Sequence, residues 1–252
     1  MKAPLLAYTE EKDLHPNYNI SQEVSVEITA DNLESAIIQR VVKNKKIERE
    51  LVNTYEELKE EEIIRYNMDS ALAGSSRELE SGRMGAGWII RNKEEIGSNI
   101  SFSCSIENWP SSTHAELGAI WAALLTAPSR SQVHIFTDSK VAIEAIGKCM
   151  GNNKLRSWFK MKNRSLLRQI KDCCTAKSLK LSLHKVKGYS GDKWNDQADL
   201  LVKEGIKRIN ILEIPETILG NLQAIPKWKD QIIECSLRLF INIISAIIYK
   251  TK

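Results

Sequence analysis

The alternation of hydrophobic and polar residues predicts β-strands in the segment between residues 63 and 207. Successive side chains of a strand point to opposite faces, so a half-buried strand alternates in hydrophobicity along the chain. Turn-forming Gly and Ser residues punctuate this segment. The strand-like runs lie at residues 63–69, 85–90, 100–105, 133–138 and 181–186.

Helical runs separate the later strands. One begins near Thr113, whose hydroxyl is suited to cap it, carries Glu116, and ends before Pro128. Further helices are expected at 139–146, at 155–173 and from Asn195 onward. The predicted order is three strands, a helix, a strand, helices, a strand and a helix. This order indicates a mixed α/β fold in which helices cover a five-stranded sheet.

The two ends of the chain differ from this central segment. Residues 1–62 are polar, acidic and poor in aromatic residues, which predicts an N-terminal extension that is helical or partly disordered. Residues 208–252 form a tail with an apolar run at 237–248. That run is short and contains Arg238, so we interpret it as a docking or core helix rather than a membrane span.

The composition is that of an ordinary globular protein, with 42% hydrophobic and 27% charged residues. Five cysteines form an odd set without CxxC spacing, which predicts reduced thiols in an intracellular, reducing compartment such as the cytoplasm or nucleus. The first residues contain no long apolar stretch, which argues against a secretory signal.

The net charge of +4 conceals a strong asymmetry along the chain. Residues 1–62 hold 8 basic and 14 acidic side chains, a net charge of −6. Residues 140–208 hold 17 basic and 6 acidic side chains, a net charge of +11. A basic half around acidic candidate residues is typical of a protein that acts on a polyanion such as nucleic acid.

Four carboxylates stand where their local patterns could direct them to one site. They are Asp69 at the end of the first strand, Glu116 in the first turns of a helix, Asp138 at a strand end and Asp199 in the last helix. Carboxylates gathered closely repel one another unless a cation neutralises them. Hard divalent cations such as Mg²⁺ prefer oxygen ligands, so this set indicates metal-assisted phosphoryl chemistry.

Four sequence blocks resemble, in order, the motifs of the ribonuclease H family. They are MDS at 68–70 with GAGW at 85–88, STHAEL at 112–117, FTDS at 136–139, and VKGYSGDKWNDQAD at 186–199. In the family the last stretch reads roughly V-K-G-H-x-G followed by N-E-x-A-D. The resemblance covers residues 63–207 and is nearer to retrotransposon ribonuclease H domains than to cellular enzymes. It implies a ribonuclease H-like fold with a mixed five-stranded sheet flanked by helices.

The same resemblance implies a function. It makes Asp69, Glu116, Asp138 and Asp199 the catalytic, metal-binding carboxylates for two Mg²⁺ ions, with Mn²⁺ as a possible substitute. The implied reaction is endonucleolytic hydrolysis of the RNA strand of an RNA–DNA hybrid by a two-metal mechanism. The order of the acids differs from the D…D…E of integrases, and Ala71 replaces the second acid of exonuclease D-x-E motifs.

This chain departs from the family pattern at three positions. Tyr189 stands at the position of the family's loop His, and a phenol with a pKa near 10 cannot exchange protons at neutral pH as an imidazole does. Ser70 stands where the family usually has Gly. Asp196 replaces a Glu, and we interpret it as stabilising a helix N-terminus through the helix dipole.

Substrate contacts are predicted from polar and basic residues around these motifs. Hydroxyl and amide groups can recognise the 2′-hydroxyls of RNA, and the candidates are Ser112, Thr113, Asn195 and Tyr189. Basic residues could follow phosphates: Lys154, Arg156, Lys160, Lys162, Arg164 and Arg168.

The histidines at 114, 134 and 184 lack Cys partners at ligand spacing and are interpreted as structural. The Gly85–Gly87 pattern is interpreted as a strand with close backbone packing rather than a nucleotide loop.

Two other hypotheses stay open from the sequence. Tyr189 and Ser70 are compatible with a catalytically weak or inactive module, derived from a mobile element, that binds nucleic acid or a partner. The chain could also be the terminal piece of a reverse-transcriptase polyprotein, although it contains no Tyr-x-Asp-Asp polymerase motif. The oligomeric state is not predicted.

Overall fold

The computed structural model describes most of the segment that the sequence assigned to the domain. Described residues are 33–72, 83–90, 100–107, 111–151, 161–187, 193–207, 210–214, 227–228, 231–233, 235, 238–242 and 245. The main strands are β1 (Ile63–Leu72), β2 (Met84–Ile90), β3 (Ser101–Ile106), β4 (Gln132–Thr137) and β5 (Lys180–Lys185). The helices are α1 (Leu33–Val41), α2 (Lys45–Leu58), α4 (Ser112–Thr126), α5 (Lys140–Met150), α7 (Arg164–Ala176) and α8 (Lys193–Lys207).

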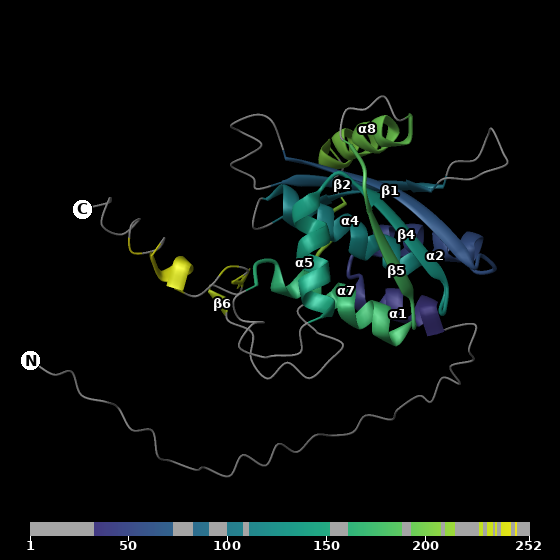
Figure 1. Ribbon diagram of the computed structural model, residues 1–252, viewed down its shortest axis with the longest axis horizontal. Coiled ribbons are helices and arrows are strands. Elements are labelled where there is room, and N and C mark those ends of the chain that lie inside the picture. The colour runs from purple at the N-terminus through teal and green to yellow at the C-terminus, as the bar shows by residue number, and fades with distance from the viewer. Residues whose placement is uncertain are drawn as a thin grey trace, which may run out of the picture.

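The strands form one mixed sheet in the order β3-β2-β1-β4-β5 (Figure 1). β1, β2 and β3 pair in antiparallel fashion, whereas β4 and β5 run parallel to β1. This confirms the mixed five-stranded sheet predicted from the sequence. The connections through α4 and through α5 and α7 supply the crossovers that parallel neighbours require.

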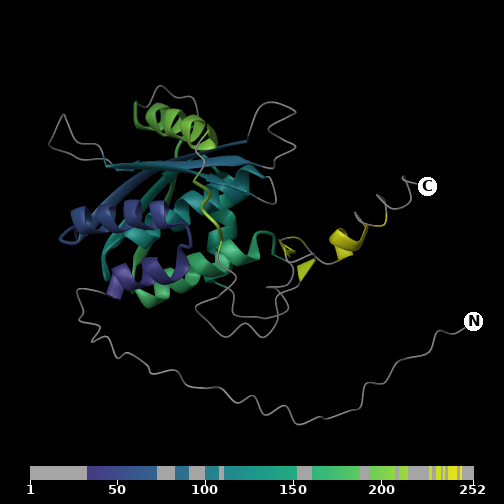
Figure 2. The same cartoon turned by 180° about the vertical axis from the view of Figure 1, so that it is seen from behind.

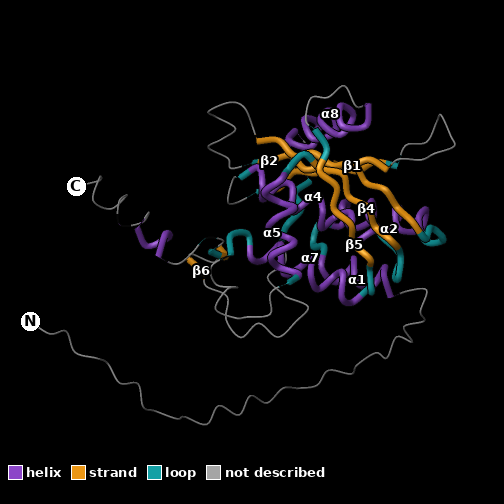
Figure 3. The backbone as a smooth tube through the Cα atoms, in the orientation of Figure 1, coloured by secondary structure: helices purple, strands orange, loops and turns teal. Residues whose placement is uncertain are grey.

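Helices cover the two faces of the sheet unequally (Figures 1 and 2). α4, α7, α1 and α2 lie on one face, where α4 packs on β1 and β2 and contacts α7, α2 and α1. α8 lies on the other face, over β1, β2 and β3. The tube view in Figure 3 shows these layers as helix, sheet and helix.

Strand alternation assigns the central strands to these two faces. Ile64, Tyr66 and Met68 of β1 are buried, as are Val133 and Ile135 of β4, and these side chains face α4. Trp88 packs edge-on against Tyr66, with ring centroids 5.2 Å apart, and stacks on Phe102 of β3 at 5.5 Å. Large aromatic rings therefore fill the core between the sheet and α4.

α4 is buried along nearly its whole length, and its two ends have polar partners inside the protein. At the start, the Ser111 hydroxyl accepts a hydrogen bond from the His114 amide. The cap is therefore Ser111, and the prediction that Thr113 caps this helix is wrong. At the end, the buried Lys177 ammonium donates to the carbonyls of Leu124 and Leu125, at 3.2 and 2.8 Å.

The acidic N-terminal region contributes two helices to this core. In α1 and α2, Ile38, Ile47 and Leu51 are at most 1% exposed and belong to the same hydrophobic cluster as the sheet. Glu34 accepts a hydrogen bond from the Ser129 amide. Burial raises the pKa of Glu34, but the hydrogen bonds from Ser129 outweigh it and the net shift is downward. The helices α1 and α2 thus pack their apolar side on the domain.

The predicted basic helix at 155–173 needs correction. The helix α7 begins at Arg164 and continues to Ala176, beyond the predicted end. Its N-cap, Asn163, has a left-handed backbone with φ of 53° and makes no side-chain capping bond. Residues 152–160, where the predicted helix began, lie outside the described residues.

The tail adds a short extension to the sheet edge. Ile211 forms a parallel bridge to Ser105 of β3, and the Leu212 amide donates to the Ser105 carbonyl at 2.7 Å. Such a segment blunts an edge strand that would otherwise present unpaired backbone groups. Residues 238–242 are helical. Within the described part of the chain, no helix is long and apolar enough to cross a membrane.

All five cysteines are free thiols in this structure. Cys173 and Cys174 of α7 are buried, and burial raises their thiol pKa values to about 11 and about 12. Thiols held in the protonated form are poor nucleophiles. These two cysteines therefore act as small core residues, and the reducing compartment stays a prediction.

Glycines allow α8 to approach the sheet at backbone distance. A Cβ on Gly85 would lie 2.2 Å from the Val202 carbonyl oxygen, and a Cβ on Gly205 would lie 2.7 Å from the Cys104 carbonyl oxygen. A Cβ on Gly87 would lie 3.4 Å from the Val202 Cγ2. The interpretation of Gly85–Gly87 as a strand with close backbone packing is confirmed.

We expect Gly85→Ala to destabilise the protein, because the new methyl group meets backbone atoms of α8 that cannot rotate away. Overpacking of this kind costs about 1–3 kcal/mol of unfolding free energy. The matched control is Gly147→Ala in α5, where an added Cβ meets nothing within 4 Å. Removing a helical glycine there is expected to stabilise by about 1 kcal/mol. Urea denaturation followed by circular dichroism measures both, and equal shifts would contradict the close packing of α8.

Candidate carboxylate site

Asp69 and Asp138 lie at the same end of two neighbouring parallel strands. The pairing of β1 with β4 runs in constant register from Ile63 opposite Gln132 to Asn67 opposite Phe136. Continuing that register by two residues places Asp69 opposite Asp138. Side chains two residues apart share a face, so both carboxylates belong to the face of the sheet opposite α4. Both are partly exposed.

Glu116 reaches the same sheet end from α4. It is 1% exposed, and the Thr137 hydroxyl donates a hydrogen bond to its Oε1. The Thr137 oxygen also accepts a hydrogen bond from the Ser139 amide, at 3.0 Å. One hydroxyl thus ties the Glu116 carboxylate to the last residue of β4 and to the cap of α5, on either side of Asp138.

Asp199 is carried by α8, on the other side of the sheet from α4. α8 packs on β1 and β2, and Val202, three residues after Asp199, lies against Gly87, the pairing partner of Asp69. The Asp199 carboxylate forms an ion pair with Lys203, with Nζ to Oδ2 at 2.5 Å. Its charge is therefore balanced by a side chain one turn further along the same helix.

The four carboxylates come from β1, α4, the end of β4 and α8. Glu116 contacts Thr137, the residue before Asp138, on the α4 face of the sheet. Asp69 and Asp138 belong by register to the opposite face, at the same end of neighbouring strands. The structure does not gather three or more Asp, Glu, His or Cys side chains into a metal-holding group anywhere among the residues it describes. The donor set itself is all oxygen, which fits Mg²⁺ or Mn²⁺ rather than a softer metal.

The predicted substrate-contacting residues are less well placed by the structure. Ser112 is exposed and Thr113 partly exposed at the start of α4, two turns or less from Glu116. Asn195 lies in the first turn of α8. Tyr189 lies outside the described residues. These four assignments remain predictions.

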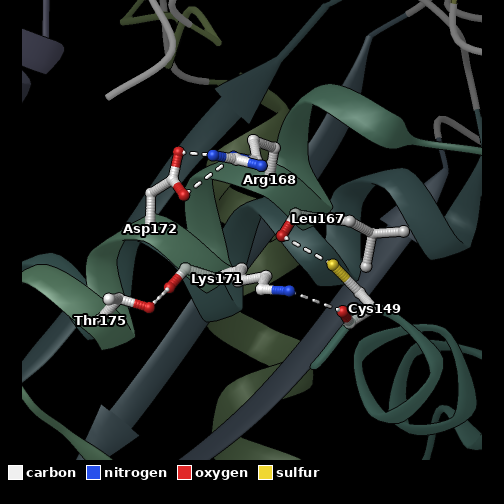
Figure 4. Close-up of polar contacts among 6 residues, drawn as sticks. All are labelled: Cys149, Leu167, Arg168, Lys171, Asp172 and Thr175. Carbon is white, nitrogen blue, oxygen red and sulfur yellow. Dashed lines mark hydrogen bonds and ion pairs between the residues drawn. The ribbon is translucent and has the colours of Figure 1, made fainter. Parts of the chain in front are cut away.

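Two of the predicted phosphate-contacting residues, Arg164 and Arg168, have partners within the protein. Arg164 is 4% exposed and donates to the Ile233 carbonyl, so its prediction as a phosphate contact is wrong. Arg168 pairs with Asp172 at 2.8 Å on the same helix (Figure 4). Lys171 donates to the Cys149 carbonyl at the end of α5 (Figure 4). Lys162 is exposed, and residues 154, 156 and 160 lie outside the described residues.

Thr137 lies in the FTDS motif, but the sequence predicted no role for it. Thr137 precedes Asp138, and strand alternation turns it toward α4, where it meets Glu116. The alternation was visible in the sequence, but the helix residue that it meets was not. Pairing of a strand position with a helix position depends on the packed fold.

Comparison with known proteins agrees with this fold. A statistical model of the RNase H family matches residues 69–207, which is more than half of the 252 residues. The chain therefore belongs to the RNase H family. The match begins at Asp69 and includes Glu116, Asp138 and Asp199.

Two solved structures are similar to this chain. One is the solution structure of the PFV RNase H domain, with 19% identity over 57% of this chain and 94% of that chain, at a TM-score of 0.46. The other is LC9-RNase H1, described as a type 1 RNase H with the type 2 active-site motif. It has 17% identity over 57% of this chain and 72% of that chain, also at a TM-score of 0.46. No curated protein matches the sequence.

We expect Thr137→Val to destabilise the fold, because it removes the donor to a buried carboxylate while keeping the side-chain shape. A buried polar group that loses its hydrogen bond costs about 1–3 kcal/mol. Thr137→Ser is the matched control, because it keeps the hydroxyl. Urea denaturation of both variants gives the comparison, and equal stability of the two would show that the hydroxyl is not what holds Glu116.

Proposed function

We propose that this protein hydrolyses the RNA strand of RNA–DNA hybrids with the help of divalent metal ions. The observation that supports the proposal is the register of β1 and β4. Continued by two residues, this register pairs Asp69 with Asp138, and Glu116 accepts a hydrogen bond from Thr137, the residue before Asp138. We infer from these positions that the acidic residues, which come from distant parts of the sequence, serve one site at the carboxyl end of the parallel strands.

In this proposal Asp69, Glu116, Asp138 and Asp199 hold Mg²⁺, and Mn²⁺ can replace it. The metal supplies charge neutralisation at the phosphate and a nucleophilic water at neutral pH. The residues fit such ions by chemistry, since all four are anionic oxygen donors. The rigid attachment of Glu116 to Thr137 limits the movement of that carboxylate, which favours a fixed ligand geometry.

Asp199 takes part in the proposal through its position on α8. In the structure its carboxylate faces the Lys203 ammonium. A metal ion bound there would compete with Lys203 for the same oxygen. The α8 helix cannot slide to adjust, because its backbone rests on Gly85 and Cys104. We therefore expect Lys203 to turn toward solvent, where it is already largely exposed.

A second function is favoured by a specific observation. The absence of a three-carboxylate group among the described residues, together with Tyr189 at the position of the family's loop His, fits a weak or inactive module that binds nucleic acid. Such a module would bind the hybrid but leave it intact. The two functions differ in cleavage and not in binding, so both must be measured.

The cleavage test uses a labelled RNA–DNA hybrid with Mg²⁺ and the full chain. Asp138→Asn and Asp199→Asn are expected to lower the cleavage rate about 100-fold or more. Losing a metal-binding carboxylate forfeits several kcal/mol of transition-state stabilisation, and each 1.4 kcal/mol is tenfold in rate. Asp196→Asn is the matched control: this exposed acid lies one turn earlier on α8 and is expected to keep the wild-type rate.

Background cleavage by the wild type, equal to that of Asp138→Asn, would reject the nuclease proposal. Hybrid binding by that same inactive protein, measured in Ca²⁺, would then support the binding module. If Asp196→Asn loses as much activity as Asp199→Asn, the assignment of Asp199 is wrong.

A further inference from the structure

The face of the sheet opposite α4 presents regular rows of side chains across β1, β4 and β5. One row holds Arg65, His134 and Ser182, and the next holds Asn67, Phe136 and His184. The same register continued leads to Asp69 and Asp138. The proposed carboxylate site and this surface are therefore parts of one sheet face, two residues apart along β4.

Three rings on this face are stacked together. The His184 ring lies 5.2 Å from that of His134 and 4.7 Å from that of Phe136, with interplanar angles of 27° and 18°. His134 Nδ1 and His184 Nε2 are 3.0 Å apart and share a hydrogen bond. Stacking and the hydrogen bond hold the rings in one arrangement, so the surface is ordered before anything binds.

These rings are not core residues. α8 packs over β1, β2 and β3 on this face, and His134, Phe136, Ser182 and His184 all remain partly exposed. On the opposite face of β4, by contrast, Val133 and Ile135 are fully buried. Aromatic rings on a partly exposed sheet face are the feature on which single-stranded nucleic acids stack their bases.

The charge of the surface suits a phosphate backbone. Arg65 is the register neighbour of His134, and Lys180 lies one row earlier on β5, on the same face and exposed. Burial, then His184 and Arg65, lowers the pKa of His134, which favours the uncharged form of this flat ring. Rings that could stack on bases thus lie beside cationic side chains that could contact phosphates.

We propose that Phe136, His134 and His184, with Arg65 and Lys180, form a binding surface for single-stranded nucleic acid leading to the carboxylate site. The ligand is recognised by unpaired bases and phosphates, which DNA and RNA share. The idea that this strand is a single-stranded extension of the hybrid that the protein cleaves rests on the proposed function. Binding of the single strand does not depend on that function.

The test measures binding of a fluorescent 12-nucleotide single strand to the full chain by anisotropy, in EDTA so that cleavage plays no part. We expect His184→Leu to weaken binding about tenfold, because leucine has no π-face. His184→Phe restores a ring and is expected to bind within about twofold of wild type. Arg65→Gln is expected to weaken binding and flatten its salt dependence, whereas Lys148→Gln, an exposed charge on α5, leaves both unchanged.

An abasic strand of the same length tests stacking without any change to the protein. Wild type is expected to bind it about tenfold more weakly than the normal strand. Equal affinity for the two strands, or equal loss with His184→Leu and His184→Phe, would overturn the proposal and leave the rings as a cross-strand packing contact. The affinities for DNA and RNA strands of the same sequence are compared to identify which nucleic acid binds more tightly. Binding without cleavage of any hybrid would reject the proposed function and still uphold this surface.

Discussion

The burial of α4 is the constraint on which the rest of the structure depends. Thirteen of its residues are buried, so neither end of the helix can leave its polar groups to water. Lys177 satisfies the carbonyls of Leu124 and Leu125 at one end, although burial lowers the pKa of its amine. At the other end Ser111 caps the helix, and His114 shares a hydrogen bond with Asn163 of the loop before α7. With both ends fixed, Glu116 meets Thr137 in a single position.

The opposite face of the sheet is organised by a different principle. There α8 rests on glycines, and the contact is between backbones rather than between interlocking side chains. Among the described elements, α8 covers the β1–β3 half of this face, where β4 and β5 present polar and aromatic residues. The acidic end of β4 and the ring surface beside it are consequences of this half coverage.

Much of the fold could be predicted from the sequence, because strand alternation and helix periodicity are local properties. The β4 pattern, with Val133 and Ile135 buried, is an example, and so is the helix that carries Glu116. The start of α7 could not be predicted, because Asn163 adopts a left-handed backbone that no neighbouring residue signals. Arg164 was misassigned because its partner, Ile233, lies 69 residues away. A shared site for Asp69 and Asp138 stays a prediction, and the register that pairs their strands comes from the structure alone.

The packing of α1 and α2 has a consequence for how the family region can be separated from its surroundings. The family match begins at Asp69, yet Leu51 and Ile47, well before it, sit in the common core. A fragment limited to the matched region would lack α1 and α2. It would therefore expose the side of α4 that these helices cover and would lose the hydrogen bond between Ser129 and Glu34. Such a fragment would expose apolar surface and would be prone to aggregation. The boundary of the folding unit therefore lies earlier than the boundary of the sequence signature.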